Sequence, residues 1–470
     1  MALYASTQAN AVKRQKTGLR DTSTRSNVVD SNEYFQGIQK IEYKPEAGIE
    51  ETLCYRYYNA VERVHGRTME EWLRPSISFW HAFNTSPQHD FDSWNQSLLQ
   101  RPWDDGNHTL ETYKRRIRAA FEFYSKLGVK YWCVWDRDLA PEGDTLEETN
   151  HNMDEIMEFI LDLQQKTGTR LLWLAVNLHY NPRYNSGACT SSDASVLSFA
   201  GAQVKKAMEV AHKLGAESFL FRGIKEGFSS HLTTDHTKQL RGFARLLKMT
   251  SDYRDRIGYR GQLLLEPNYE NFFNYRKNDK YLNSSKVYHY YDYDTTSALC
   301  FLKHFNLDRY YKISAKIGHQ LSLASIYGSL GSIDATCITA PPNIHETTLL
   351  LKTVIENGGI QPGGLNIGVT MYPDSTDLKD MALAYISAID SFAKGLRNAA
   401  KIIADGILSK NVQQRYLSYH SGFGSRFMNG EASLEECEEQ AHKHNNEVFN
   451  TSSRTEHWET VFARYSEKLK

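Results

Sequence analysis

Short apolar runs alternate with longer segments of helical periodicity along most of the chain after Ser76. The runs are almost continuously apolar, which is typical of parallel strands that are covered on both faces. Eight such runs are predicted as strands: 76–80, 131–135, 170–176, 218–223, 262–267, 312–317, 331–335 and 363–369.

The segments between these strands have apolar residues at 3–4 spacing and end at glycines, as amphipathic helices do. The clearest cover residues 109–127, 145–166 and 193–214, which end at or near Gly128, Gly168 and Gly215. Eight strand–helix units predict an α/β fold, a (β/α)₈ TIM barrel, with functional residues at the carboxyl ends of the strands. A further helix to about Ala404 precedes a polar C-terminal arm, 405–470, which has too few apolar residues for a core of its own.

Composition narrows the class of protein. Of the 470 residues, 40% are hydrophobic and 24% are charged, which is typical of a globular chain. A net charge of −1 gives no reason to expect a nucleic-acid or anionic-membrane partner. The six cysteines lack C-x-x-C spacing and resemble the core thiols of a reducing compartment. We expect a cytoplasmic protein.

Residues 1–32 differ from the rest, being rich in Ser and Thr and basic, with no acid before Asp21. They fit a flexible solvated tail, a mitochondrial presequence or a nuclear-import-like arm around KRQK. We interpret them as a flexible tail, and a mitochondrial location is the alternative to the cytoplasmic one.

From Glu33 onward the strand ends and loops resemble xylose isomerase of the longer, class II type. The matching segments are EYFQGIQKIEY, FWHAF, RPW, LGVKYWC, NLHYNPRYNSGA, LGAESFLFRG, KEGF, GSIDA, STDLKD and RYLSYHSGFG. The resemblance implies a TIM barrel, 33–404, in which two divalent cations (Mg, Mn or Co) drive a hydride shift between C1 and C2 of an open-chain aldose. It also implies substrate-contacting positions at His81, Trp173 and Glu226.

Two catalytic positions of that family are changed in this chain. The family has H-D-x-D after its second strand, where its His opens the sugar ring; here Trp135 takes the place of the His and Asp138 is retained. The family has E-P-K after strand five, where its Lys is catalytic; here Asn268 takes the place of the Lys. By this comparison no catalytic set is intact, and Asp138 would face an indole.

The metal-ligand positions are degenerate as well. Glu266, His319 and Asp334 match family ligands, whereas Lys316 and Gly368 replace two ligand carboxylates and the family's Asp-x-Asp loop is deleted. An ammonium inside a cluster that must offset a charge of +4 opposes metal binding, so we expect no metal cofactor. We expect Lys316 to lie between Glu266 and Asp334; the alternative is that it points to solvent.

Two changes of length accompany these substitutions. Between Glu266 and Asp294 the chain carries an insertion rich in Tyr, Asn and Lys, which fits sugar or nucleic-acid binding or packing at the rim or on a neighbouring subunit. His319 and Asp334 are only fifteen residues apart, so the helix between them should have two or three turns at most.

These observations lead to the hypothesis of a degenerate, non-catalytic homologue, a pseudoenzyme kept as a structural or binding subunit. The alternatives are an active aldose–ketose isomerase and a metal-free sugar-binding protein. The resemblance implies that the C-terminal region embraces a neighbouring subunit, so we predict a homodimer or homotetramer, alone or within a larger assembly. We predict no nucleic-acid or membrane partner.

Overall fold

The computed structural model describes residues 33–84, 101–268, 289–372, 374–444 and 452–468. All of its helices and strands belong to the second of two units into which the chain divides, Tyr34–Lys470. The tail 1–32 and most of the insertion after Glu266 (269–288) lie outside the described residues.

Eight parallel strands form a closed barrel, which confirms the predicted fold. Around the barrel they run in chain order, and β12 pairs with β3 to close it. The strands are β3 (Pro75–Ser78), β4 (Tyr131–Trp135), β5 (Arg170–Ala175), β6 (Ser218–Arg222), β8 (Gln262–Glu266), β10 (Tyr311–Lys316), β11 (Leu330–Ile338) and β12 (Leu365–Val369). Each coincides with one of the eight predicted apolar runs, to within a few residues at its ends.

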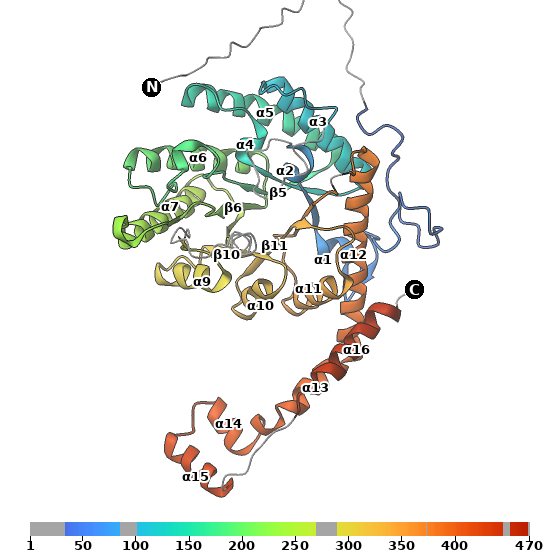
Figure 1. The fold of residues 1–470 in the computed structure, drawn as a ribbon, viewed down its shortest axis with the longest axis vertical. Helices are drawn as coiled ribbons and strands as arrows, with labels where there is room; N and C mark the ends of the chain where they lie inside the picture. Colours follow the sequence, from blue (N-terminus) through green and yellow to red (C-terminus); the bar gives the residue numbers. More distant parts are fainter. Residues whose placement is uncertain (1–32, 85–100, 269–288, 373, 445–451, 469–470) are drawn as a thin grey trace, which may run out of the picture. The chain divides into compact units, whose positions relative to one another are not determined.

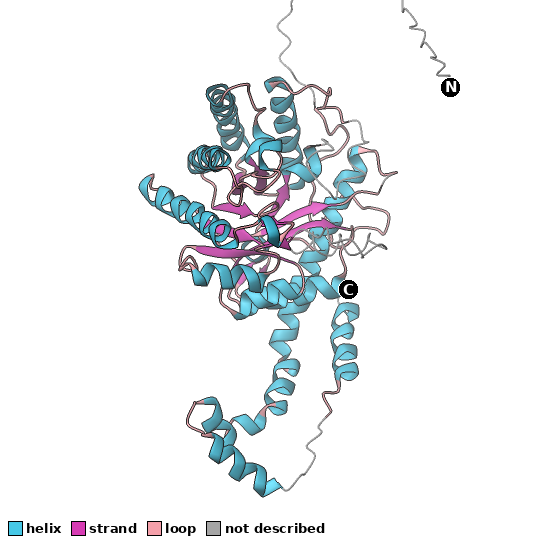
Figure 2. Cartoon of the chain, turned by 60° about the vertical axis from the view of Figure 1, so that its left-hand side comes forward, coloured by secondary structure: helices cyan, strands magenta, loops and turns pink. Residues whose placement is uncertain are grey.

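Helices surround the strands (Figures 1 and 2). The larger ones are α3 (Leu110–Leu127), α5 (Leu146–Thr167), α6 (Ala194–Lys213), α7 (His236–Arg256), α9 (Thr295–His304), α10 (His319–Ile326), α11 (Ile344–Glu356) and α12 (Leu378–Asp405). The three helices predicted from periodicity are α3, α5 and α6. Thr109 and Thr145 cap α3 and α5 at their N-termini, and left-handed Gly128 and Gly168 end them.

Shorter elements lie mostly in the loops between the barrel strands. They are β1 (Arg63–Val64), β2 (Arg67–Thr68), α1 (Met69–Leu73), α2 (Phe79–Phe83), α4 (Asp136–Leu139), η1 (Pro182–Tyr184), β7 (Gly227–Phe228), η2 (His231–Thr233) and β9 (His289–Tyr290). As predicted, the helix between His319 and Asp334 is short, because α10 has only eight residues. None of the helices in the described residues is both long and apolar enough to span a bilayer.

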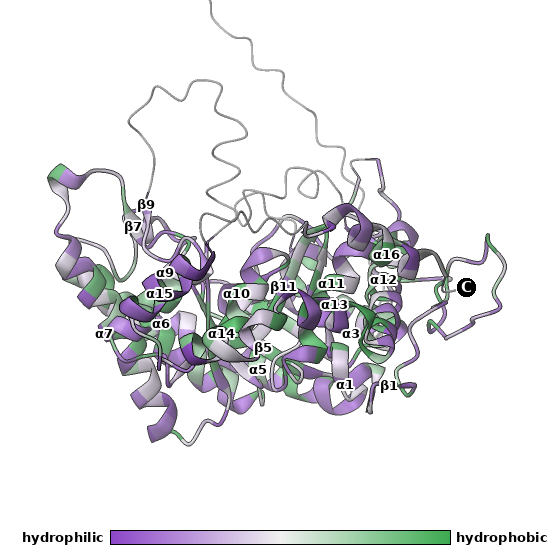
Figure 3. Cartoon of the chain, turned by 90° about the horizontal axis from the view of Figure 1, so that it is seen from below, coloured by the Kyte–Doolittle hydropathy of each residue, from purple (hydrophilic) through white to green (hydrophobic). Residues whose placement is uncertain are grey.

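Two separate apolar clusters stabilise the fold. The larger lies between the strands and the helices, whose outward sides are predominantly hydrophilic (Figure 3). The smaller lies in the barrel interior, mainly beside β4 and β5. It is separate from the larger cluster because side chains along a strand alternate between the two faces of the sheet. Its buried members are Trp80, Tyr131, Cys133, Trp135, Leu172, Trp173, Ala175, Leu220 and Leu264.

The C-terminal arm consists of α13 (Ile407–Arg415), η3 (Leu417–Tyr419), α14 (Gly422–Met428), α15 (Leu434–His444) and α16 (Thr455–Lys468). From α13 to α15 no residue is buried. The last helix instead packs on this chain's own barrel, against α11 and α12, and Phe462 is buried with its ring 4.3 Å from that of His345. Phe462 is the apolar side chain that anchors α16 to the barrel.

Candidate functional site at the carboxyl ends of the strands

The interior of the barrel is polar on the side formed by β8, β10, β11 and β12. Lys316 ends β10 and is paired in register with Asp334 on β11. Its Nζ lies 2.5 Å from Asp334 Oδ2, 2.8 Å from Thr336 Oγ1 and 4.0 Å from Glu266 Oε1. The Lys316 side chain is only 7% exposed. The predicted internal ion pair is confirmed, and the alternative that Lys316 points to solvent is wrong.

Further hydrogen bonds hold the two carboxylates in place. Asp334 Oδ1 accepts from Asn366 Nδ2 at 2.9 Å, and Glu266 Oε2 accepts from Ser314 Oγ at 3.1 Å. The guanidinium of Arg222, at the end of β6, lies 3.2 Å from Glu266 Oε1. Each acid is therefore fixed by a cation and by a neutral donor from a neighbouring strand.

The two acids respond to this environment in opposite directions. Burial raises the pKa of Glu266, the charge of Asp334 raises it further, and the cations offset only part of the effect. Burial acts on Asp334 in the same direction, but the ammonium of Lys316 and the guanidinium of Arg222 outweigh it, so its pKa is lowered. Asp334 thus carries the negative charge that Lys316 neutralises.

Aromatic rings line another part of the barrel interior. Among them is Trp135, at the position where the family resemblance places the ring-opening His. Trp135 packs edge-on against Trp80, with ring centroids 5.6 Å apart, and against His179 at 5.2 Å. Trp173, expected at a substrate-contacting position, packs 5.6 Å from Trp80. The carboxylate of Asp138 accepts a hydrogen bond from Asn84 Nδ2 at 2.7 Å. That Asp138 faces the indole of Trp135 stays a prediction.

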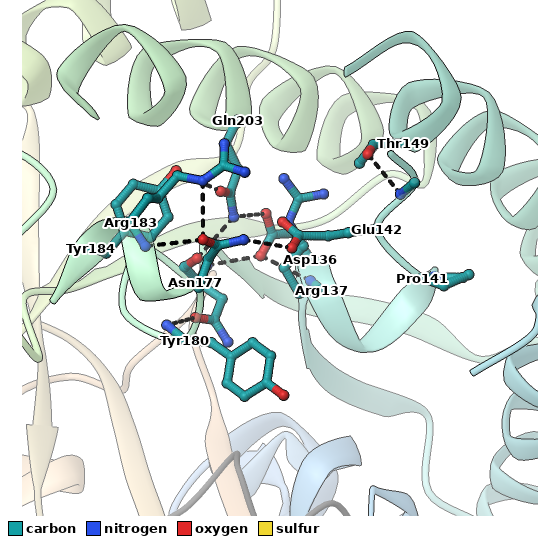
Figure 4. Close-up of polar contacts among 12 residues, drawn as sticks. Asp136, Arg137, Pro141, Glu142, Thr149, Asn177, Tyr180, Arg183, Tyr184 and Gln203 are labelled. Atoms are coloured by element: carbon teal, nitrogen blue, oxygen red, sulfur yellow. Dashed lines mark hydrogen bonds and ion pairs between the residues drawn. The ribbon is translucent and has the colours of Figure 1, made fainter. Parts of the chain in front are cut away.

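Asp136 connects the loops after β4 and β5 (Figure 4). Its carboxylate accepts hydrogen bonds from the backbone N–H of Asn177 at 2.8 Å and from Gln203 Nε2 at 2.7 Å. Beside it, Arg137 lies 3.2 Å from Glu142. The contacts of Asp136 therefore hold the loop after β5 and helix α6 to the end of β4.

Glu226 has a similar structural role. Its carboxylate accepts hydrogen bonds of 2.9–3.1 Å from the backbone N–H groups of Ala188, Cys189 and Thr190, and one of 2.8 Å from Thr190 Oγ1. These bonds satisfy the backbone of a loop that packs against the site. The substrate-contacting role expected for Glu226 stays a prediction, since these contacts are all with the loop.

A cavity of about 800 Å³ opens beside the ion pair and extends between α10 and α11. Its lining includes Lys316, His319, Asp334, Thr336, Cys337 and Glu346. Because α10 is so short, it leaves the space beside α11 uncovered. The cavity is therefore a consequence of the shortened β10–β11 connection.

Comparison with known proteins places the chain in a family. It is 37% identical to the xylose isomerase of Thermoanaerobacterium saccharolyticum over 454 residues, which cover 92% of this chain and 99% of that protein. It is 38% identical to the xylose isomerase of Arabidopsis thaliana over 428 residues, covering 87% of this chain and 86% of that protein. The chain belongs to the xylose isomerase family.

Two further similarities concern parts of the chain or the fold. Residues 412–466 match the family model described as the XylA2 C-terminal domain. Among solved structures, L-ribulose 3-epimerase aligns with 71% of this chain and 97% of its own, at 12% identity and a TM-score of 0.45. So low a score carries no argument about function.

The three residues that the sequence comparison matched to family metal ligands do not converge in the structure. Glu266 and Asp334 meet at Lys316, but His319, the first residue of α10, is exposed. Across the part of the chain that the structure describes, no group of three or more His, Cys, Asp or Glu residues is arranged to hold a metal ion. The donors present do not fit a pair of divalent cations, because an ammonium already occupies the space between the two remaining carboxylates.

The position of Gly368 is closed to a carboxylate for a steric reason. A Cβ added to Gly368 would lie 2.5 Å from Cδ2 of His81 and 3.0 Å from Cγ2 of Thr336. His81 is itself buried, and its ring occupies the space into which a side chain at 368 would project. The sequence comparison indicated that Gly368 replaces a ligand carboxylate. It did not indicate that the His81 ring fills the space beside Gly368.

Asn268, at the family's catalytic lysine position, is paired with an acid that the sequence comparison missed. Its Nδ2 donates to Asp292 Oδ1 at 3.1 Å, and its backbone N–H donates to the Asp292 carbonyl at 2.9 Å. Burial raises the pKa of Asp292 to about 8. No motif marks Asp292, because only the return of the chain after the insertion brings it beside β8.

Proposed function

We propose that this xylose isomerase homologue is a pseudoenzyme that serves as a structural or binding subunit. The observation that supports the proposal most strongly is the buried Lys316 ammonium, 2.5 Å from Asp334 and 4.0 Å from Glu266. Two hard cations need several oxygen donors and a net negative cluster. The ammonium of Lys316 cancels part of the negative charge that metal ions would need. It would also repel each metal ion at short range, and burial strengthens that repulsion.

The groups that would move protons and stabilise charge are replaced as well. An indole stands at the ring-opening position, with no acceptor and no titration in the physiological range. A neutral amide stands at the position of the catalytic ammonium and already donates to Asp292. General acid–base catalysis and oxyanion stabilisation both need groups that Trp135 and Asn268 do not provide.

We predict that the pure protein isomerises neither xylose nor glucose above background with Mg²⁺, Mn²⁺ or Co²⁺. The measurement is ketose formation by chromatography, together with the divalent-metal content of the protein. The control is Glu266→Gln, which removes a retained ligand position. Metal-dependent turnover that disappears in Glu266→Gln would establish the alternative, an active isomerase.

A sugar-binding role without metal is the second candidate, and the cavity of about 800 Å³ beside the ion pair favours it. Hydroxyl and amide groups line part of it, including Ser322, Thr336 and Asn343. A cavity of this size suits a monosaccharide. A thermal-shift screen of aldoses, ketoses and alditols separates this role from a purely structural one.

We also propose that the chain forms a homodimer or homotetramer through its C-terminal arm. Several large apolar side chains of α13 to α15 are exposed: Ile407, Val412, Tyr416, Leu417, Tyr419, Phe427, Met428 and Leu434. So many exposed apolar residues on one segment are typical of an interface. We propose that a second copy of this chain covers these side chains, as in the expected symmetric assembly.

The assembly is tested by the double variant Leu417→Glu with Phe427→Glu. We predict that wild type is a dimer or tetramer at micromolar concentration by light scattering and that the variant is a monomer, because two buried charges oppose the contact. Leu232→Glu is the matched control, since Leu232 is 96% exposed outside the arm. A monomeric wild type contradicts the proposal, as does a variant that keeps the wild-type mass.

A further inference from the structure

A thiol and an imidazole meet beside the cavity. Cys337, near the end of β11, lines the cavity, and its Sγ lies 3.9 Å from Nε2 of His81 on α2. The thiolate, and not the thiol, is the nucleophilic form of cysteine, and a neighbouring imidazole that accepts the proton favours it. Neither residue carries the argument for a pseudoenzyme given above.

Two local features hold the pair in place. Cys337 has a left-handed backbone, with φ of 59°, which is uncommon for a residue with a Cβ. Gly368 leaves room for the His81 ring, because a Cβ there would lie 2.5 Å from His81 Cδ2. The substitution that removes a family metal ligand is therefore also the one that admits the imidazole.

The cavity presents suitable chemistry around the sulfur. Cys337 is half-buried, whereas Lys316 and Asp334 lie deeper and neutralise each other. Hydroxyl and amide groups of Ser322, Thr339, Asn343 and Thr353 also line the space. Such walls suit a small hydroxylated molecule better than a hydrocarbon.

We propose that Cys337 and His81 form a nucleophilic pair that adds reversibly to small hydroxylated aldehydes in this cavity. The thiol proton moves to His81 Nε2, a bond forms between Cys337 Sγ and the carbonyl carbon, and the carbon–oxygen π bond breaks. The proton then passes from Nε2 to the new alkoxide oxygen, which gives a hemithioacetal. The step consumes no oxidant or reductant, and it holds whether or not the barrel is a pseudoenzyme.

The reactivity of the pair is measured by limited alkylation of the full-length protein with iodoacetamide, followed by peptide mass spectrometry. Cys300 is the internal reference, because it is exposed and lies on α9, away from the pair. We expect Cys337 to react on the order of tenfold faster than Cys300 despite its lower exposure. A rate equal to or below that of Cys300 overturns the proposal.

Two variants test the role of the imidazole. His81→Gln should slow the alkylation of Cys337 about tenfold and leave that of Cys300 unchanged. Gly368→Ala keeps the imidazole but displaces its ring, so it should also slow Cys337. Circular dichroism and the Cys300 rate show whether each variant is folded. If the alkylation rate of Cys337 is unchanged in both folded variants, the thiol reacts without help from His81. That result overturns the proposed nucleophilic pair.

The ligand class is tested by protection. Glycolaldehyde should slow the alkylation of Cys337 but not of Cys300, and ethylene glycol, which has no carbonyl, should slow neither. Protection by both compounds indicates binding without addition, and protection by neither excludes small hydroxylated aldehydes. Either of these outcomes overturns the addition step.

Discussion

Replacing Lys316 by methionine is expected to lower the free energy of unfolding by about 3–5 kcal/mol at pH 7. Methionine is apolar and of similar length, so the variant removes the charge with little change in packing. Asp334 then stays buried without the cation that lies 2.5 Å from it, whereas Arg222 still lies 3.2 Å from Glu266. A buried charge that loses its partner keeps the full cost of its desolvation.

The loss should shrink toward pH 3. In wild type the pKa of Asp334 is lowered, so its contribution to stability is present above its unfolded pKa of about 4 and disappears as the pH falls. In the variant, the ammonium that lowers the pKa of Asp334 is gone, whereas burial still raises it and Arg222 and Asn366 offset only part of that effect. The pKa of Asp334 is therefore higher than in wild type, and protonation at low pH relieves the charge that has lost Lys316. Wild type and variant should therefore differ most above pH 5.

Chemical denaturation at fixed protein concentration measures both quantities. Lys312→Met is the matched control, because Lys312 lies on the same strand and is exposed. Its effect should stay within about 0.5 kcal/mol. An equal loss at pH 3 and pH 7 in Lys316→Met would show that the charge of Asp334 is not the cause.

Restoring the family's carboxylate at position 368 should damage the fold instead of rebuilding a metal site. We expect Gly368→Asp to lower the free energy of unfolding by about 2–4 kcal/mol. The new Cβ would lie 2.5 Å from Cδ2 of His81, so the ring must move. The added carboxylate would also enter an interior in which Asp334 and Glu266 already lie.

The steric and electrostatic parts of this effect can be separated. Gly368→Ala adds only the Cβ and should show the steric part, whereas Gly368→Asp combined with His81→Ala should recover stability by removing the clash. Thermal denaturation and divalent-metal content are measured for all three variants. Tight binding of Mn²⁺ by Gly368→Asp at wild-type stability would show that the site is more adaptable than its geometry indicates.

The sequence alone determined the barrel, and it predicted a change in the chemistry of the site. Most strands are largely apolar runs, and helices α3, α5 and α12 each end at a left-handed glycine, so local pattern was enough to find all eight strands. The Lys316 ion pair was also predictable, because the family resemblance places Lys316 at a strand position that points into the site. The structure then pairs Lys316 in register with Asp334, and residues at one register of neighbouring parallel strands point to the same face. Comparison with the strand-end motifs of the family likewise indicated that Trp135 replaces a His and that Asn268 replaces a Lys.

Only the tertiary structure decided which groups meet. His319 matches a ligand position in sequence, but the start of α10 leaves it exposed. His81 fills the space beside Gly368 and reaches Cys337, 256 residues away along the chain. Asp292 joins Asn268 across the insertion. These pairings depend on how segments distant in the chain pack together, and local hydrophobic pattern carries no information about such contacts.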